Sequence, residues 1–193
     1  NREAKYEITV KANSATATYD GKEHEAVGVE TYEFTVEGNS YTVSGLSTED
    51  PKQKDAGSYT NNITGTPVVT DKEGNVVTSE FEVKTENGSL EIGKAAVTLK
   101  SATLSKKYDG NALVNGDTAL EVESGFAEGE GATYNFTGSQ TVVGSSANAF
   151  SYELNSNTNI DNYAISKQEG TLTVTNREAK YEITVKANSA TAT

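Results

Sequence analysis

The sequence predicts an all-β protein, with short strands arranged in a sandwich or a barrel. Apolar and polar residues alternate over short runs, as in Lys5 to Lys11, where Tyr6, Ile8 and Val10 fall on one face. Thr, Val, Tyr and Ile fill these runs, whereas Gly, Asn and Asp lie between them. No apolar stripe with a 3.6-residue period continues over three turns, so no long amphipathic helix is expected.

The chain repeats itself at two levels. The eighteen residues 1–18 recur unchanged at 176–193, which indicates one full period of a tandem array and the start of the next. Within the period, 8–21 aligns without gaps on 97–110, both stretches ending in Tyr-Asp-Gly. We therefore predict a β module A at 1–93, a β module B at 94–175, and the first strand of the next repeat at 176–193.

Module A is predicted to hold a series of short strands separated by turn residues. Residues 46–56 form a polar loop with room for one helical turn, and Asn87-Gly88 is interpreted as a turn. A hairpin with a five-residue loop is expected between Val68-Val69 and Val76-Val77. The expected strands are 5–11, 14–19, 31–37, 40–44 and 57–64, followed by runs around Phe81 and Val83 and around Leu90 and Ile92.

Module B shows the same pattern with different spacing. Its expected strands are near 119–123, 132–137, 149–154, 162–166 and 170–175. Burying one large apolar side chain is worth on the order of 1.5–3 kcal/mol, so a module of this size can fold alone, although such small domains are marginal. The expected core is Val97, Leu99, Leu120, Val122, Tyr134, Phe136, Phe150, Tyr152, Leu154, Tyr163, Ile165, Leu172 and Val174.

Composition excludes several classes of partner. Lys and Arg number 16 against 28 Asp and Glu, and the net charge of −12 argues against binding to nucleic acid or an anionic membrane. The absence of Cys excludes a disulfide framework and thiolate metal sites. No run approaches the roughly 18 apolar residues of a membrane span, so membrane insertion is not expected.

Two motifs resemble known families. Asp55-Ala56-Gly57-Ser58-Tyr59 resembles the D-x-G-x-Y element of immunoglobulin-like domains, in which the Tyr59 position forms a corner by bonding back to nearby backbone. Module B has Val143-Gly144-Ser145 in that place. The pairing of Tyr19-Asp20-Gly21 and Tyr108-Asp109-Gly110 with closing strands such as GTLTVT resembles the Y-D-G or MBG-type repeats of large bacterial surface proteins, especially cell-wall-anchored adhesins of Gram-positive gut bacteria.

The resemblance implies two tandem immunoglobulin-like β-sandwich modules, with β-grasp-like modules as the alternative. It implies an extracellular, cell-wall-anchored protein whose repeats form a stalk behind a distal adhesive region, with neighbouring repeats as partners. The alternative function is an adhesive module that binds a host glycan or protein directly. The sequence offers no nucleophile–base–orienter set and no paired-carboxylate cleft, so we expect no enzyme activity and no cofactor.

Several residues permit a functional and a structural interpretation. The Tyr-Asp-Gly motifs are either recognition loops or, as we favour, tight turns beside a core tyrosine. His24 is the single histidine and is interpreted as a solvated loop residue. The acidic residues Asp117, Glu121, Glu123, Glu128 and Glu130 lack calcium-loop spacing, so we favour a charged surface.

Lys11 and Lys100 occupy matching positions and raise the possibility of an isopeptide crosslink to a late strand. The two closing strands share no Asn, so an outward-facing Lys is favoured at both positions. The junctions between modules also differ. Gly93-Lys94 is very short and predicts limited bending, whereas 175–180 is longer and charged and predicts a hinge. We expect 176–193 to pair with an exposed sheet edge.

Overall fold

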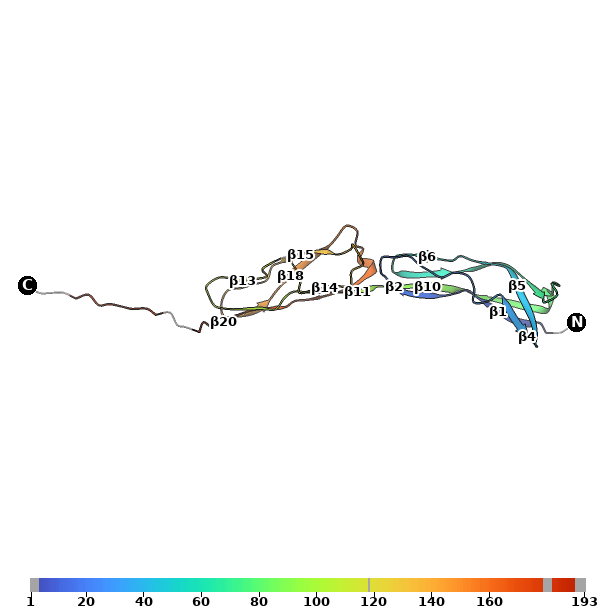
Figure 1. Ribbon diagram of the computed structural model, residues 1–193, viewed down its shortest axis with the longest axis horizontal. Helices are drawn as coiled ribbons and strands as arrows, with labels where there is room; N and C mark the ends of the chain where they lie inside the picture. Colours follow the sequence, from blue (N-terminus) through green and yellow to red (C-terminus); the bar gives the residue numbers. More distant parts are fainter. Residues whose placement is uncertain (1–3, 118, 179–181, 190–193) are drawn as a thin grey trace, which may run out of the picture. The chain divides into compact units, whose positions relative to one another are not determined.

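The computed structural model describes residues 4–117, 119–178 and 182–189 and confirms the all-β prediction (Figure 1). The described residues contain no α-helix, and therefore none that a β-grasp-like sheet could wrap around. Two single-turn 3₁₀ helices occur, η1 (Thr78–Glu80) and η2 (Ile160–Asn162). Among these same residues, no helix is long and apolar enough to cross a membrane.

The chain divides into two compact units. Unit 1 comprises Asn1–Val97, Gly125–Gly131 and Leu154–Ile165, and unit 2 comprises Thr98–Ser124, Ala132–Glu153 and Ser166–Thr193. The sequence predicts a single boundary near residue 93. Unit 1 also includes two segments from the second half of the period, Gly125–Gly131 and Leu154–Ile165, and both contribute residues to the candidate site.

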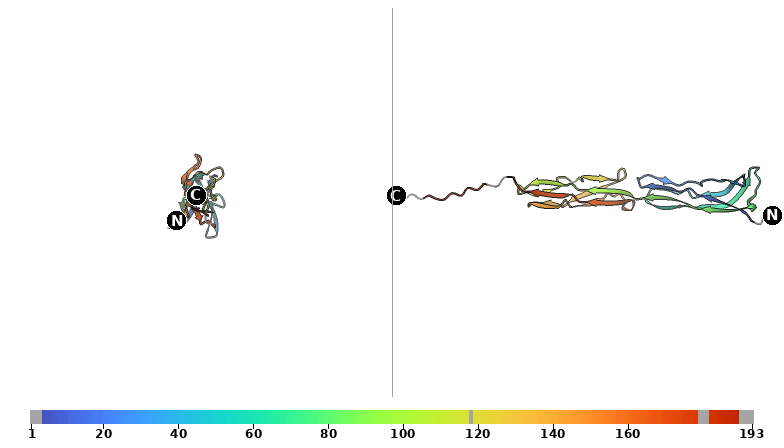
Figure 2. Two further views of the ribbon diagram at one scale, coloured as in Figure 1. Left: turned by 90° about the vertical axis from the view of Figure 1, so that its left-hand side faces the viewer. Right: turned by 90° about the horizontal axis from the view of Figure 1, so that it is seen from below.

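Unit 1 contains paired strands from both ends of module A. Strand β1 (Tyr6–Lys11) runs parallel to β9 (Phe81–Glu86), with Tyr6 opposite Phe81. Strand β2 (Ala15–Thr18) runs parallel to β10 (Gly88–Gly93), which pairs antiparallel with β7 (Gly57–Asn61). In the right-hand view of Figure 2, most of these strands run side by side. The remaining pairs are β4 (Glu33–Val36), β5 (Asn39–Thr48) and β8 (Ile63–Asp71) in that order, and β3 (His24–Glu25) with β6 (Lys52–Gln53).

A cluster of buried apolar side chains holds these sheets together. Its members are Ile8, Val10, Val43, Val69 and Phe81. Ile8 and Val10 are the inward residues that the two-residue period predicts, and Val10 is fully buried. Tyr6 and Tyr41 add rings against Phe81, with centroids 5.6 Å and 4.8 Å from it.

The first segment of the chain changes partner between β1 and β2. At this point Asn61, which is fully buried, donates from Nδ2 to the Asn13 carbonyl at 3.1 Å and accepts the Asp50 amide at 3.0 Å. A Cβ on Gly88 would lie 2.1 Å from the Asn13 carbonyl oxygen, so only glycine fits there. Asn87-Gly88 is therefore not a hairpin turn, because β9 and β10 pair with different strands on either side of this close approach.

Unit 2 repeats this device at matching positions. Asn148 is fully buried and donates to the Ala102 carbonyl at 2.9 Å, and Ala102 occupies the position in module B that Asn13 occupies in module A. A Cβ on Gly170 would lie 2.2 Å from the same carbonyl oxygen. The two halves of the period therefore share a structural detail as well as a sequence pattern.

The strands of unit 2, some of which continue into unit 1, form four small sheets. Leu99, Phe150, Leu172 and Val174 are buried among them, as expected from the sequence. The sheets are β14 (Val122–Ser124), β11 (Ala95–Lys100) and β19 (Tyr163–Gln168); β12 (Leu104–Lys107), β20 (Thr171–Thr175) and β17 (Gly144–Ala147); β13 (Leu113–Val114) with β16 (Ser139–Gln140); and β15 (Ala132–Phe136) with β18 (Phe150–Leu154).

Several predicted elements need correction. The loop expected at 46–56 has no helical turn, because β5 continues to Thr48 through a register shift at Gly45, whose φ is +78°. The run 57–64 is divided between β7 and β8. The strand expected at 119–123 is reduced to β14.

The segment that copies the first strand also differs from expectation. Residues 176–178 and 182–189 adopt no strand, and Ile183 and Val185 are 83% and 89% exposed. The edge pairing predicted for 176–193 is therefore absent from its described part. In module A the counterparts of Ile183 and Val185 are Ile8 and Val10, which are buried because β1 pairs with β9. Strand β9 lies about 70 residues after β1 in module A.

Candidate functional site

The two Tyr-Asp-Gly motifs have the same local structure. The Tyr19 amide donates to the carbonyl of Gly93, the last residue of β10, at 2.8 Å. The Tyr108 amide donates to the carbonyl of Thr175, the last residue of β20, at 2.9 Å. Gly21 and Gly110 have φ of +79° and +87°, a conformation that glycine adopts without steric cost. Each motif therefore ends its short strand beside the end of a closing strand.

The aspartate of each motif closes the turn. Asp20 accepts the Lys22 amide at 2.9 Å, and Asp109 accepts the Asn111 amide at 3.0 Å. The Lys22 amide and His24 lower the pKa of the Asp20 carboxyl. Lys106, whose Nζ lies 2.7 Å from Asp109, and the Asn111 amide lower the pKa of that carboxyl. Turn geometry thus accounts for the aspartate and glycine of both motifs.

Tyr19 differs from Tyr108 in what covers it. Tyr19 is only 4% exposed, and its hydroxyl donates to Glu130 Oε1 at 2.5 Å. Its ring meets that of Tyr163 edge to face, with centroids 5.3 Å apart. Glu130 and Tyr163 come from the two segments of the second half that belong to unit 1.

Glu130 accepts a second phenol in the same cluster. The Tyr163 hydroxyl donates to Glu130 Oε2 at 2.7 Å and accepts the Ala127 amide at 3.0 Å. Burial, together with the hydrogen bond to Glu130, raises the pKa of Tyr19, and burial is also the main cause of the raised pKa of Tyr163. Both phenols therefore remain protonated at neutral pH and act as donors to one carboxylate. We call Tyr19, Glu130 and Tyr163 the tyrosine–glutamate cluster.

Four further contacts lie beside this cluster in unit 1. The ideal Cβ position of Gly21 is 3.2 Å from Ala127 Cβ, so the motif glycine allows a close approach as well as a turn. Asn162, only 2% exposed, donates to Asp55 Oδ1 at 2.9 Å and accepts the Ala56 amide at 2.8 Å. The Tyr59 hydroxyl donates to the Asp55 carbonyl at 3.0 Å, which is the backbone bond expected for the D-x-G-x-Y motif.

The second motif is open in unit 2. Tyr108 is half-buried, and an added Cβ on Gly110 would meet no atom within 4 Å. Val142 and Val143 are 67% and 48% exposed and directly precede β17. Because β17 begins opposite Val174 and the Tyr108 amide bonds Thr175, these valines and Tyr108 flank the same end of β20.

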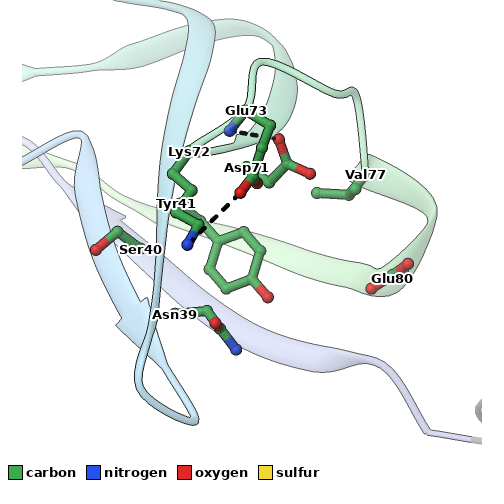
Figure 3. Close-up of a pocket in the computed structure, with 8 residues that line it drawn as sticks. All are labelled: Asn39, Ser40, Tyr41, Asp71, Lys72, Glu73, Val77 and Glu80. Atoms are coloured by element: carbon green, nitrogen blue, oxygen red, sulfur yellow. Dashed lines mark hydrogen bonds and ion pairs between the residues drawn. The ribbon is translucent and has the colours of Figure 1, made fainter.

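A cavity of about 420 Å³ lies at the start of β5 in unit 1 (Figure 3). Figure 3 shows the Tyr41 ring in the middle of the residues drawn, with the Lys72–Glu73 ion pair, 3.5 Å long, on one side. The Tyr41 ring already packs on Phe81. The cavity is lined by Asn39, Ser40, Tyr41, Asp71, Lys72, Glu73, Val77 and Glu80.

The histidine and the two lysines that the sequence singles out each pair with an acidic side chain. His24 Nε2 is 2.9 Å from Asp20 Oδ1, so the histidine braces the first turn. Lys11 and Lys100 have half-exposed side chains that pair with Glu86 at 3.2 Å and Glu121 at 2.9 Å.

Two of the acidic residues that we interpret as a charged surface rather than a calcium site lie in different surroundings. Glu130 lies in the tyrosine–glutamate cluster, whereas Glu121 pairs with Lys100. Within the described residues, no three or more His, Cys, Asp or Glu side chains are grouped so that they could hold a metal ion.

Comparison with protein-family models, curated proteins and solved structures found no match to this chain. The residues of the chain therefore carry the functional argument.

Proposed function

We propose that this chain is a repeating segment of a bacterial surface-protein stalk, which extends and spaces a distal adhesive region from the cell wall. The observation that carries the proposal is the exact return of residues 1–18 at 176–193. Tandem repetition adds length with each period, whereas a catalytic site gains nothing from being copied along a chain. In this proposal the modules are tandem immunoglobulin-like sandwiches, and the protein is extracellular and anchored to the cell wall.

The tyrosine–glutamate cluster supports this function. It joins Tyr19 of module A to Glu130 and Tyr163, which come from the predicted module B, within one compact unit. Two buried phenols on one carboxylate form a connected polar network, which loses several bonds if any member moves away. Such a network favours a fixed attachment of the segments that carry Glu130 and Tyr163 to the rest of unit 1.

Small-angle X-ray scattering of chains with one, two and three copies of residues 1–175 tests the proposal. The largest dimension should grow by a constant increment of roughly 80 Å per period, because each module is about 40 Å long if it contains strands of about ten residues and loops. Light scattering on the same samples must show monomers, so that growth reflects the chain itself. A dimension that stops increasing after the second copy would rule out a stalk.

A second candidate function is direct binding of a host glycan. The cavity beside Tyr41 favours it, because an aromatic ring next to Asp71 and Glu80 can offer both stacking and hydrogen bonding to a sugar. A glycan array probed with the 193-residue chain tests this candidate. Binding that is lost in Glu80→Ala but retained in Glu91→Ala, on strand β10, would establish the cavity as the site.

A further inference from the structure

We propose that the open Tyr108-Asp109-Gly110 motif is a docking site for the next copy of module A, whose exposed Glu37 accepts the Tyr108 hydroxyl. The inference rests on the proposed function and names the partner of each repeat. The template is the tyrosine–glutamate cluster of unit 1, where the first motif is covered. The exact copy of residues 1–18 identifies the partner as another module A.

Module A carries the counterparts of the residues that cover Tyr19. Glu37-Gly38 directly precedes β5, as Glu130-Gly131 directly precedes β15, and each pair stands four residues before an aligned tyrosine. Phe81 is the first residue of β9 after η1, as Tyr163 is the first residue of β19 after η2. The next copy therefore offers a carboxylate in the same place along the fold, whereas the ring of Phe81 is already buried against Tyr6 and Tyr41.

The carboxylate is held by a phenol in both cases, although the phenol comes from different strands. Glu130 is held by Tyr163 on β19. Glu37 accepts the hydroxyl of Tyr6, which lies opposite Phe81 on the paired strand β1. Module B has Ala95 at the position of Tyr6. The phenol that holds the glutamate is therefore on the first strand, β1, in module A and on the late strand, β19, in module B. A Glu that is positioned by a tyrosine is thus a shared feature of both module ends.

The surroundings of the second motif fit an apolar contact. Val142 stands where module A has Asp55, and Glu80 stands where module B has Asn162, so the Asp55–Asn162 hydrogen bond is not repeated. An aspartate at position 142 would face Glu80 of the next copy, and valine avoids that repulsion. Val76 beside η1 is 68% exposed and gives Val142 and Val143 an apolar surface to cover.

The linker leaves room for this contact. Lys94 alone separates β10 from β11, whereas residues 176–180 separate β20 from the counterpart of Tyr6. Glu178 in this linker pairs with Lys107, the last residue of β12, and so stays beside Tyr108. Docking and a free hinge at 175–180 are therefore opposite outcomes that one measurement separates.

Nitration of tyrosine, mapped by peptide mass, measures whether Tyr108 is covered. The 193-residue chain is compared with a chain in which residues 1–175 are followed by a second copy of 1–193, with Tyr108→Phe in that second copy so that one Tyr108 reports. Docking should slow nitration of Tyr108 about tenfold, corresponding to about 90% occupancy of the docked state. Tyr19 should be protected in both chains. An unchanged Tyr108 rate overturns the proposal and establishes a hinge.

Variants identify the surfaces in contact. Glu37→Ala in the second copy should restore the Tyr108 rate, whereas Glu82→Ala, at an exposed position on β9, should leave it slow. Val142→Asp in the first copy changes a surface residue outside the fold core and should also restore the rate by facing Glu80. If both Glu37→Ala and Val142→Asp leave Tyr108 protected, another surface covers it and this docking geometry is wrong.

The outcome is separable from that of the stalk. Scattering that shows constant growth in length while Tyr108 stays reactive overturns docking and retains the stalk. Scattering that shows no growth while Tyr108 is protected overturns the stalk and retains the docked joint.

Discussion

The two Tyr-Asp-Gly motifs share their backbone and differ in their cover. Each tyrosine amide bonds the end of a closing strand, and each aspartate accepts the amide two residues later. Tyr19 is nevertheless 4% exposed and bonded to Glu130, whereas Tyr108 is half-buried. Turn geometry thus explains the aspartate and glycine that both motifs share. The segments that pack on the motif determine how deeply its tyrosine is buried and what its hydroxyl bonds.

Replacing each tyrosine by alanine gives the largest expected contrast. Tyr19→Ala should lower the free energy of unfolding of unit 1 by about 3–5 kcal/mol, because it removes a buried ring and a donor to Glu130. Tyr108→Ala in the same 193-residue chain should cost about 1 kcal/mol, because Tyr108 is only partly buried. Urea unfolding followed by tyrosine fluorescence measures both. Equal costs would mean that the cover over Tyr19 contributes nothing.

Removing the shared acceptor tests the cluster itself. Glu130→Ala leaves the phenols of Tyr19 and Tyr163 without their carboxylate and should cost about 1–3 kcal/mol. The matched control is Glu121→Ala, whose carboxylate pairs with Lys100 at the surface and whose loss should change stability by about 0.5 kcal/mol or less. The same urea titration compares the two variants. A Glu130 variant as stable as the Glu121 variant would show that the hydrogen bonds of Glu130 to the two phenols do not contribute to the free energy of unfolding.

The two buried asparagines should behave alike, in contrast to the two tyrosines. Asn61 and Asn148 each donate to the carbonyl at the strand switch, Asn13 or Ala102. Alanine at either position leaves that carbonyl without its buried donor and should cost about 1–3 kcal/mol in its own unit. Hydrogen exchange measured separately for peptides of each unit reports the loss. A loss in one unit alone would show that the two switches are not equivalent.

Local sequence signals predicted most of the strands and the turns of both motifs. The alternation in Lys5 to Lys11 gives β1 and its inward face, and Asp-Gly gives the turn at both motifs. The segment 46–56 was predicted wrongly because Gly45 lets β5 continue through a register shift, an effect of its partner β8 rather than of its own composition. Asn87-Gly88 was interpreted as a turn because that pair of residues favours turns, but the close approach of the Asn13 carbonyl requires Gly88.

The candidate site was predicted only in part. The sequence identifies Tyr19 as a motif residue and Glu130 only as one of several acidic residues. It does not predict the hydrogen bond between them, because the two residues are 111 positions apart. Tyr163 was assigned to the core, which is correct for its ring and misses its hydroxyl. Asn61 and Asn148 carried a usable signal, since each stands four residues after an aligned glycine, Gly57 or Gly144. Only the structure shows that both reach a backbone carbonyl at matching positions.

Alanine at the two motif glycines gives the smallest and sharpest contrast. Both positions have positive φ, so Gly21→Ala and Gly110→Ala share a backbone cost of about 1–2 kcal/mol. Gly21→Ala also brings its Cβ to 3.2 Å from Ala127, whereas Gly110→Ala meets open space, so Gly21→Ala should cost about 0.5–1 kcal/mol more. Paired thermal melts of the two variants measure this difference directly, because the shared strain cancels. A larger cost at Gly110 would contradict the cover seen over the first motif. In the chain with a second copy of the period, docking at Tyr108 should place new atoms beside Gly110, and the difference between the two variants should shrink.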